Sequence, residues 1–205
     1  MSEVPVPLLG APPVERRDAA RNREALLVAA RHLIDRCGVE AVTMEAVAQA
    51  AGVGKGTVFR RFESRAGLMA AMLDFREQEF QRRVLSGPPP LGPGAPAMER
   101  LLAFGRERLT YNVEAARLIE AAGRVGRRAT GARSFSALHI AHLLGELGVT
   151  GNRGFLAHSL LAPLEAVALD RARGPEALDD LPLDEIAGAW ADLAHRVVTG
   201  TPAAS

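Results

Sequence analysis

The residue types that could do chemistry gather in one short stretch, "GVGKGTVFRRF", at positions 52–62. It contains Lys55, the only lysine of the chain, and the adjacent pair Arg60 and Arg61. Such a pattern suits a nucleic acid, because small residues let the backbone come close while long cations reach base edges or phosphates. An ordinary solvated helix face is the competing interpretation, and these residues alone leave it open.

Two short helices joined by a glycine-containing turn must position these side chains. Thr43 is a suitable N-cap for the first helix, which has Glu45 in its first turn and ends before Gly52. In the second helix, Val58 and Phe62 lie four residues apart and are expected to face inward. With a longer helix before the pair, this order predicts a helix-turn-helix whose last short helix can enter the DNA major groove.

The composition favours an all-α protein. Of the 205 residues, 48% are hydrophobic but only 4% are aromatic, and alanine and leucine supply most of the apolar content. A single cysteine, Cys37, excludes an internal disulfide and fits a reducing compartment. The sequence has neither a secretory signal pattern nor about 18 consecutive apolar residues, so we expect a cytoplasmic protein that does not enter the membrane.

Changes in composition along the chain predict its domains. We expect a flexible leader at 1–17, a helix-turn-helix DNA-binding domain at 18–66, a second helical domain at 67–200, and a tail at 201–205. The Pro/Gly-rich residues 87–96 should form a loop, and Pro163 should bend or split its helix. The helices expected in the second domain lie at 65–86, 97–111, 113–124, 134–147, 152–173 and 183–199.

The N-terminal motifs are specific enough to indicate a family. The segments "AARHLIDRCG", "VTMEAVAQAAGVGKGTVFRRF" and "SRAGL" follow one pattern almost position by position. Through them, residues 20–68 resemble the DNA-binding domain of tetracycline-repressor-like (TetR family) transcriptional regulators. Carried over by position, the resemblance implies phosphate contacts from Thr43, Thr57, Phe59, Arg61 and Arg65, and groove contacts from Gly54, Lys55, Gly56 and Arg60. The family usually has tyrosine where Phe59 stands, so a hydroxyl contact is lost here.

The resemblance implies a sequence-specific DNA-binding transcriptional regulator, expected to be a ligand-responsive homodimeric repressor on a near-palindromic operator of double-stranded DNA. We predict no cofactor and no enzymatic activity, because the sequence lacks a complete phosphate loop, a nucleophile elbow and paired inward carboxylates. A helical protein-interaction module that does not bind DNA, and a small helical enzyme, are the alternatives.

A small-molecule effector of unknown identity is implied to bind inside the C-terminal domain. The residue pattern predicts a pocket with an apolar lining and a few polar groups, and ordinary core packing of the same residues is the alternative interpretation. The selected residues are Phe104, Tyr111, Leu118, Phe135, His139, His142, Phe155 and His158. Three of them are histidines, but no carboxylate or thiol completes a ligand set, so no metal site is predicted.

The resemblance also implies a dimer through the last two long helices. The apolar face of each is the predicted interface, and packing within the core of the subunit is the alternative. These faces consist of Leu156, Leu160, Leu164, Val167, Ile186, Trp190, Leu193 and Val197. The helix at 65–86 should act as a lever that moves the DNA-reading residues when ligand binds.

Overall fold

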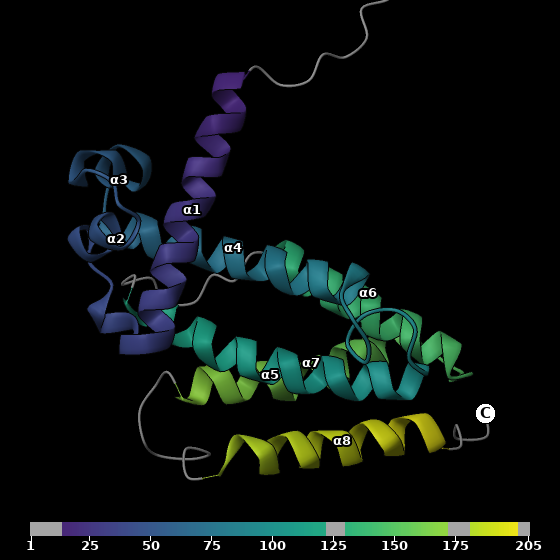
Figure 1. Cartoon of the computed structure of the whole chain (residues 1–205). Helices are drawn as coiled ribbons and strands as arrows, with labels where there is room; N and C mark the ends of the chain where they lie inside the picture. Colours follow the sequence, from purple (N-terminus) through teal and green to yellow (C-terminus); the bar gives the residue numbers. More distant parts are fainter. Residues whose placement is uncertain (1–13, 122–129, 172–180, 201–205) are drawn as a thin grey trace, which may run out of the picture. The chain divides into compact units, whose positions relative to one another are not determined.

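The computed structural model describes residues 14–121, 130–171 and 181–200 (Figure 1). These ranges contain helices and no strand, which confirms the all-α prediction. The elements are α1 (Val14–Cys37), the 3-10 turn η1 (Val39–Ala41), α2 (Met44–Ala50), α3 (Lys55–Phe62), α4 (Arg65–Ser86), α5 (Ala97–Ala121), α6 (Thr130–Glu146), α7 (Arg153–Arg171) and α8 (Leu183–Thr199). The first 13 residues of the expected leader and the whole tail at 201–205 lie outside the described residues.

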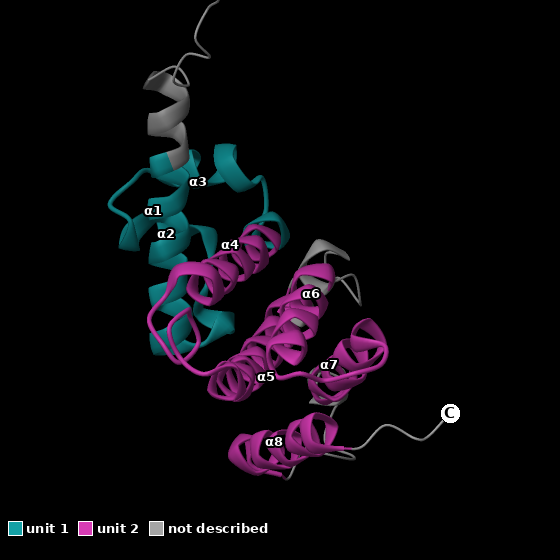
Figure 2. Cartoon of the chain, turned by 90° about the vertical axis from the view of Figure 1, so that its right-hand side faces the viewer, with its two compact units in different colours: residues 1–68 teal, residues 69–205 magenta. Residues whose placement is uncertain are grey.

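The chain divides into two compact units, residues 1–68 and 69–205, which we call unit 1 and unit 2 (Figure 2). The division falls inside α4, so the first turn of this helix belongs to unit 1 and the remainder to unit 2. In the described part of the chain, no helix combines the length and the apolar character needed to cross a bilayer.

Unit 1 is built on the apolar face of α1. Leu26, Leu27 and Ala30 of this helix are buried, as their helical spacing predicts, whereas Cys37 at its end is exposed. Helix α1 packs on α2, and α2 packs on α3. The remaining buried apolar residues of the unit are Ala29, Val42, Met44, Val47, Ala48, Val58, Phe62 and Leu68. Three helices and the first turn of α4 therefore share one small core.

Unit 2 centres on α5, which packs against α6, α7 and α8. Where α5 meets α8, a Cβ atom added to Gly105 would lie 1.9 Å from Cζ3 of Trp190, so the indole rests directly on the glycine backbone. The indole Nε1 donates to the Leu160 carbonyl of α7 at 2.7 Å. Trp190 thereby fixes three helices to one another.

The structure corrects one predicted break. Helices expected at 97–111 and 113–124 are parts of a single helix, α5, over their described residues. The break was placed at Asn112, a residue type that usually disfavours helix interiors. Here its Nδ2 donates to the Leu164 carbonyl at 2.9 Å, so tertiary packing supplies the partner. Helix α7 also continues through Pro163 and is not split there.

Candidate nucleic-acid interface

Short-range hydrogen bonds fix the turn that carries α3. The Thr43 hydroxyl accepts from the Ala46 amide at 3.0 Å, which confirms the predicted N-cap of α2. Past the end of α2, Gly52 adopts a φ of 66°, a left-handed conformation that glycine accepts at little cost. The Val53 amide then donates to the Ala48 carbonyl at 3.0 Å. The chain is thus reversed tightly before α3 begins.

Helix α3 is held in place by its inner face. Val58 is 0% exposed and Phe62 is 5% exposed, which confirms the predicted inward orientation of both. The Arg23 guanidinium of α1 lies 5.7 Å from the centroid of the Phe62 ring. Since this face is buried, the opposite face of the helix must be directed at solvent.

That outer face carries most of the residues predicted to contact DNA. Of the nine residues predicted to contact DNA, seven are exposed: Thr43, Gly54, Lys55, Gly56, Phe59, Arg60 and Arg61. Thr57 is half-buried, as is Arg65. A duplex could therefore approach α3 without any rearrangement of unit 1.

On the edge of α3 that faces α2, Lys55 is already engaged. Its ammonium forms an ion pair with the Glu45 carboxylate of α2 and lies 5.4 Å from the centroid of the Phe59 ring. The hydrogen bond from Lys55, followed by one from the backbone of Glu45 itself, holds the pKa of the Glu45 carboxyl below its ordinary value of 4.5. The lysine therefore meets a ligand with a carboxylate beside it, a feature that the sequence reading missed.

On the opposite edge of α3, a small hollow separates this helix from α1. We call it the α1/α3 notch: it has a volume of about 280 Å³ and is lined by Asn22, Leu26, Thr57, Arg60 and Arg61. Two arginines, a threonine and an asparagine therefore border one hollow. The sequence offered no signal for Asn22, because it lies on a different helix, 35 positions before Thr57.

Arg65 has a structural role at the start of α4. Its guanidinium donates from Nε to the Val42 carbonyl and from Nη2 to the Val39 carbonyl, both at 3.0 Å. Nη2 also lies 3.3 Å from the Glu40 carboxylate. Ser64 caps the same helix, since its Oγ accepts from the Gly67 amide at 3.1 Å. Arg65 thus ties the beginning of α4 to η1, a use that the predicted phosphate contact did not foresee.

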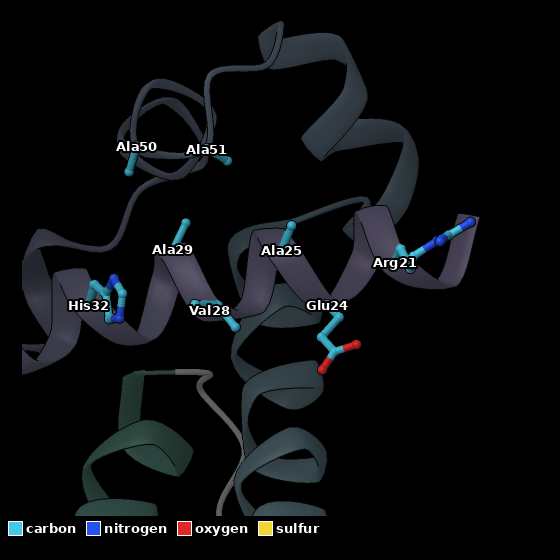
Figure 3. Close-up of a pocket in the computed structure, with 8 residues that line it drawn as sticks. All are labelled: Arg21, Glu24, Ala25, Val28, Ala29, His32, Ala50 and Ala51. Carbon is cyan, nitrogen blue, oxygen red and sulfur yellow. The ribbon is translucent and has the colours of Figure 1, made fainter. Parts of the chain in front are cut away.

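A second hollow of unit 1 lies between α1 and the end of α2. Figure 3 shows Ala50 and Ala51 across from α1, with Ala25 and Ala29 pointing toward them. This groove has a volume of about 420 Å³, and Arg21, Glu24, Val28 and His32 complete its lining. Its charged groups are of both signs, so it lacks the convergence of cations found in the α1/α3 notch.

The folded geometry of this segment agrees with comparisons to known proteins. Residues 26–72 match the family model of bacterial regulatory proteins of the tetR family. Within this segment the chain is similar to TetR-family regulators. An HTH-type transcriptional regulator of Staphylococcus aureus (strain USA300) is 38% identical over 53 residues, which are 26% of this chain and 29% of that protein. The match therefore spans less than a third of the length of this relative.

Solved TetR-family structures share the fold over most of the chain. A TetR-family transcriptional regulator from Pectobacterium atrosepticum superposes with a TM-score of 0.67 at 18% identity, covering 90% of this chain and 96% of that one. A TetR transcriptional regulator from Streptomyces coelicolor has a TM-score of 0.56 at 23% identity, with 84% and 95% covered. At these identities the likeness concerns the fold alone.

In unit 2, the residues predicted to line a ligand pocket separate into two groups. Phe104, Leu118 and His139 are buried, and the His139 ring lies 5.0 Å from that of Phe104 by centroids. Tyr111 and Phe135 pack against the same core. The other three, His142, Phe155 and His158, are exposed, with Phe155 70% exposed. The structure therefore does not bring the eight residues together.

The interior of unit 2 contains polar groups, of which the sequence predicted His139 as a pocket residue but not Ser136. His139 Nε2 and Ser136 Oγ are buried and have no hydrogen-bond partner among the described residues. Burial, then the nearby charges of Arg100 and His142, lowers the pKa of His139 from 6.5 to about 4. In the described ranges, no three His, Cys, Asp or Glu side chains are grouped so that they could hold a metal ion.

Most residues predicted at a dimer interface belong to the core of unit 2. Leu160, Leu164, Val167 and Trp190 are buried in it, and Leu156, Ile186 and Val197 pack against it. Leu193 alone of the predicted eight is exposed. Apart from Leu193, the residues of these apolar faces are therefore used within the subunit.

Proposed function

We propose that this protein is a transcriptional regulator that binds double-stranded DNA with the outer face of α3 in the major groove. The observation that carries the proposal is the orientation of α3: Val58 and Phe62 are buried, while Lys55 and Arg60 are exposed on the other side. This is the arrangement in which the second helix of a helix-turn-helix presents its side chains to base edges.

The proposed contacts follow from the position of each residue on unit 1. Gly54, Lys55, Gly56 and Arg60 face the groove, where arginine can read guanine by a bidentate hydrogen bond. Phosphate contacts come from Thr43, Thr57, Phe59 and Arg61, and Phe59 gives only van der Waals contact. Arg65 contributes indirectly, by holding the start of α4 against η1.

A homodimer is part of this proposal, but of the residues that the sequence pattern selected only Leu193 belongs to the proposed interface. Helix α7 exposes Phe155, Ser159, Ala162 and Ala166 along one side, and α8 exposes Gly188, Ala189 and Leu193. Small residues allow two helix pairs to approach closely, and the exposed Phe155 would then be covered. A two-fold axis would place two copies of α3 about 34 Å apart on a near-palindromic operator.

The oligomeric state tests this interface. Ala162→Glu places a charge on the outer face of α7, and we expect light scattering to show a monomer where the unchanged protein is a dimer. Gln78→Glu, an exposed position of α4, is the matched control and should leave the mass unchanged. A dimer that survives Ala162→Glu would contradict the assignment of the face.

A small-molecule effector and a repressor role complete the proposal. The buried Ser136 Oγ and His139 Nε2 support a polar ligand within unit 2, because a buried polar group without a partner costs about 1–3 kcal/mol. A ligand that satisfies both groups would recover that free energy and bias the protein toward one conformation.

Selection of bound fragments from random DNA tests the function directly. We expect the selected fragments to share an inverted repeat, and their mobility shift to weaken as salt rises. Replacing Lys55 and Arg60 together by Gln should weaken binding by at least about tenfold, since each contact is worth roughly 1–3 kcal/mol. Arg106→Gln, on the exposed surface of α5, controls for the loss of a positive charge. Failure to bind any duplex would favour the protein-interaction module instead.

A further inference from the structure

We propose that the α1/α3 notch binds one phosphate of the DNA backbone and that Asn22, on α1, is one of its contacts. The inference rests on the proposed function and extends the interface to a helix outside the helix-turn-helix pair. Its basis is the set of side chains that surround the notch: Asn22, Thr57, Arg60 and Arg61 around Leu26.

The chemistry of the lining selects an anion. The Asn22 amide, the Thr57 hydroxyl and both guanidinium groups can each donate hydrogen bonds, and the described residues that line the notch include no carboxylate. Arginine presents its donors in a planar fork that matches phosphate oxygens. A cation would be repelled by the two guanidinium groups, and a neutral apolar ligand would offer no acceptor to the donors of the lining.

The volume of the α1/α3 notch and its apolar floor both suit a phosphate group. A water molecule occupies about 30 Å³ of the liquid, so a hollow of about 280 Å³ can hold a phosphate group with a few waters. Leu26 is 2% exposed and closes the floor of the notch. An apolar floor excludes some of the solvent that otherwise weakens hydrogen bonds to a charged group.

Location decides between a DNA phosphate and a free phosphate ion. Three of the five lining residues belong to α3, and Arg60 is also a proposed groove contact, so the notch borders the surface that meets DNA. A duplex whose major groove holds α3 has its backbone at the edges of that helix. We assign the notch to the backbone on the α1 side.

The first test uses Asn22→Ala on the full-length protein, with Gln78→Ala as the matched amide control. A hydrogen bond to a charged group predicts about a tenfold loss of affinity. The loss should be equal for a selected fragment and for a duplex of random sequence, because phosphates carry no sequence information. The slope of log affinity against log salt concentration should not change in Asn22→Ala, since asparagine has no charge. Asn22→Lys should instead steepen this slope by about 0.9 per subunit.

The second test locates the phosphate. Each phosphate of a selected duplex is replaced in turn by a neutral methylphosphonate. At one phosphate per half-site, the replacement should weaken binding of the unchanged protein but should have little further effect on Asn22→Ala. Losses that add at every phosphate would overturn the proposal, as would Asn22→Ala binding as tightly as the unchanged protein.

Two further outcomes are distinguishable. Titration with inorganic phosphate at constant ionic strength, followed by the NMR signal of the Asn22 side-chain amide, reports on free phosphate. Saturable binding of that ion, together with unchanged DNA affinity of Asn22→Ala, would overturn the assignment to DNA while leaving the proposed function intact. Absence of DNA binding by the unchanged protein would overturn both the proposed function and this inference.

Thermal unfolding of each variant checks that it is folded. Because Asn22 is exposed, we expect little change in the melting temperature.

Discussion

Two ion pairs of the protein have similar chemistry, but one is buried and the other is exposed to solvent. In unit 2, Arg108 Nη1 of α5 lies 2.8 Å from Glu77 Oε2 of α4, with the side chains only 2% and 11% exposed. In unit 1, Lys55 of α3 pairs with Glu45 of α2, with the side chains 57% and 56% exposed. One pair is part of an interior, and the other stands on a surface proposed to meet DNA.

The difference shows how burial decides what an ion pair does. The Arg108 guanidinium is also 5.2 Å from the Phe80 ring centroid and 4.7 Å from that of Tyr111, so the charge is enclosed on several sides. Loss of its carboxylate would leave a charge without solvent, which is costly. The pair of Lys55 and Glu45 is accessible to water and salt, so it contributes little to stability and can be exchanged for other partners.

The largest expected effect is from Glu77→Ala. We expect it to lower the free energy of unfolding by about 3–5 kcal/mol, because a buried guanidinium is left uncompensated. Chemical denaturation of the full-length protein measures this loss of stability. Asp74→Ala, an exposed position of the same helix, is the control. Replacing both partners by apolar residues, with Glu77→Leu and Arg108→Met, should recover most of the loss; a double variant as unstable as Glu77→Ala would argue against the charge explanation.

An intermediate effect is expected from His139, a buried ionisable group that remains neutral. With a pKa near 6.5 in the unfolded chain and about 4 in the folded one, its contribution is fully present above about pH 6.5. As pH falls toward 4, the unfolded chain takes up the proton first, and up to roughly 3 kcal/mol of stability is lost.

Unfolding at pH 7 and at pH 4 measures this effect against a variant that does not titrate, His139→Gln. The loss on acidification should be smaller in the variant than in the unchanged protein, because all other groups titrate in both. His195→Gln, exposed on α8, is the matched control and should behave as the unchanged protein. Equal losses in all three proteins would show that His139 does not cause the acid sensitivity.

The smallest effect is expected from Glu45→Gln, which frees Lys55 from its carboxylate. We predict a small gain in affinity for DNA of any sequence, since a solvent-exposed ion pair is weak and easily exchanged. The gain should shrink as salt rises, because exposed charges are screened. Mobility shift of random and selected duplexes measures it.

A double-mutant cycle separates the ion pair from simple charge removal. In a Lys55→Gln background, Glu45→Gln should give a smaller gain than in the unchanged protein, because the partner is already gone. An identical gain in both backgrounds would mean that Glu45 acts through general repulsion of DNA and not through Lys55.

What the sequence could predict was mainly local. The Thr43 cap, the reversal at Gly52 and the spacing of Val58 and Phe62 all depend on residues within five positions of one another. Residue type and helical period determine such features before the chain folds. The helix-turn-helix was therefore foreseen with the orientation that the structure has.

The features that the sequence could not predict depend on which helix packs against which in the folded chain. The period of α7 and α8 indicated apolar faces but not whether α5 or a second copy would cover them, and α5 does so. The partner of Asn112 lies 52 positions further along the chain, at Leu164. The pairing of Glu45 with Lys55 similarly arises only when the turn folds α3 back toward α2.

The contact between Gly105 and Trp190 constrains how unit 2 could be redesigned. Since a methyl group at position 105 would overlap the indole, a larger residue there requires a smaller side chain at position 190 or a displacement of α8. A protein engineer who wished to graft a foreign last helix onto this scaffold would have to exchange both residues together. Libraries that randomise α8 alone would mostly sample side chains that leave a gap above the bare backbone of α5.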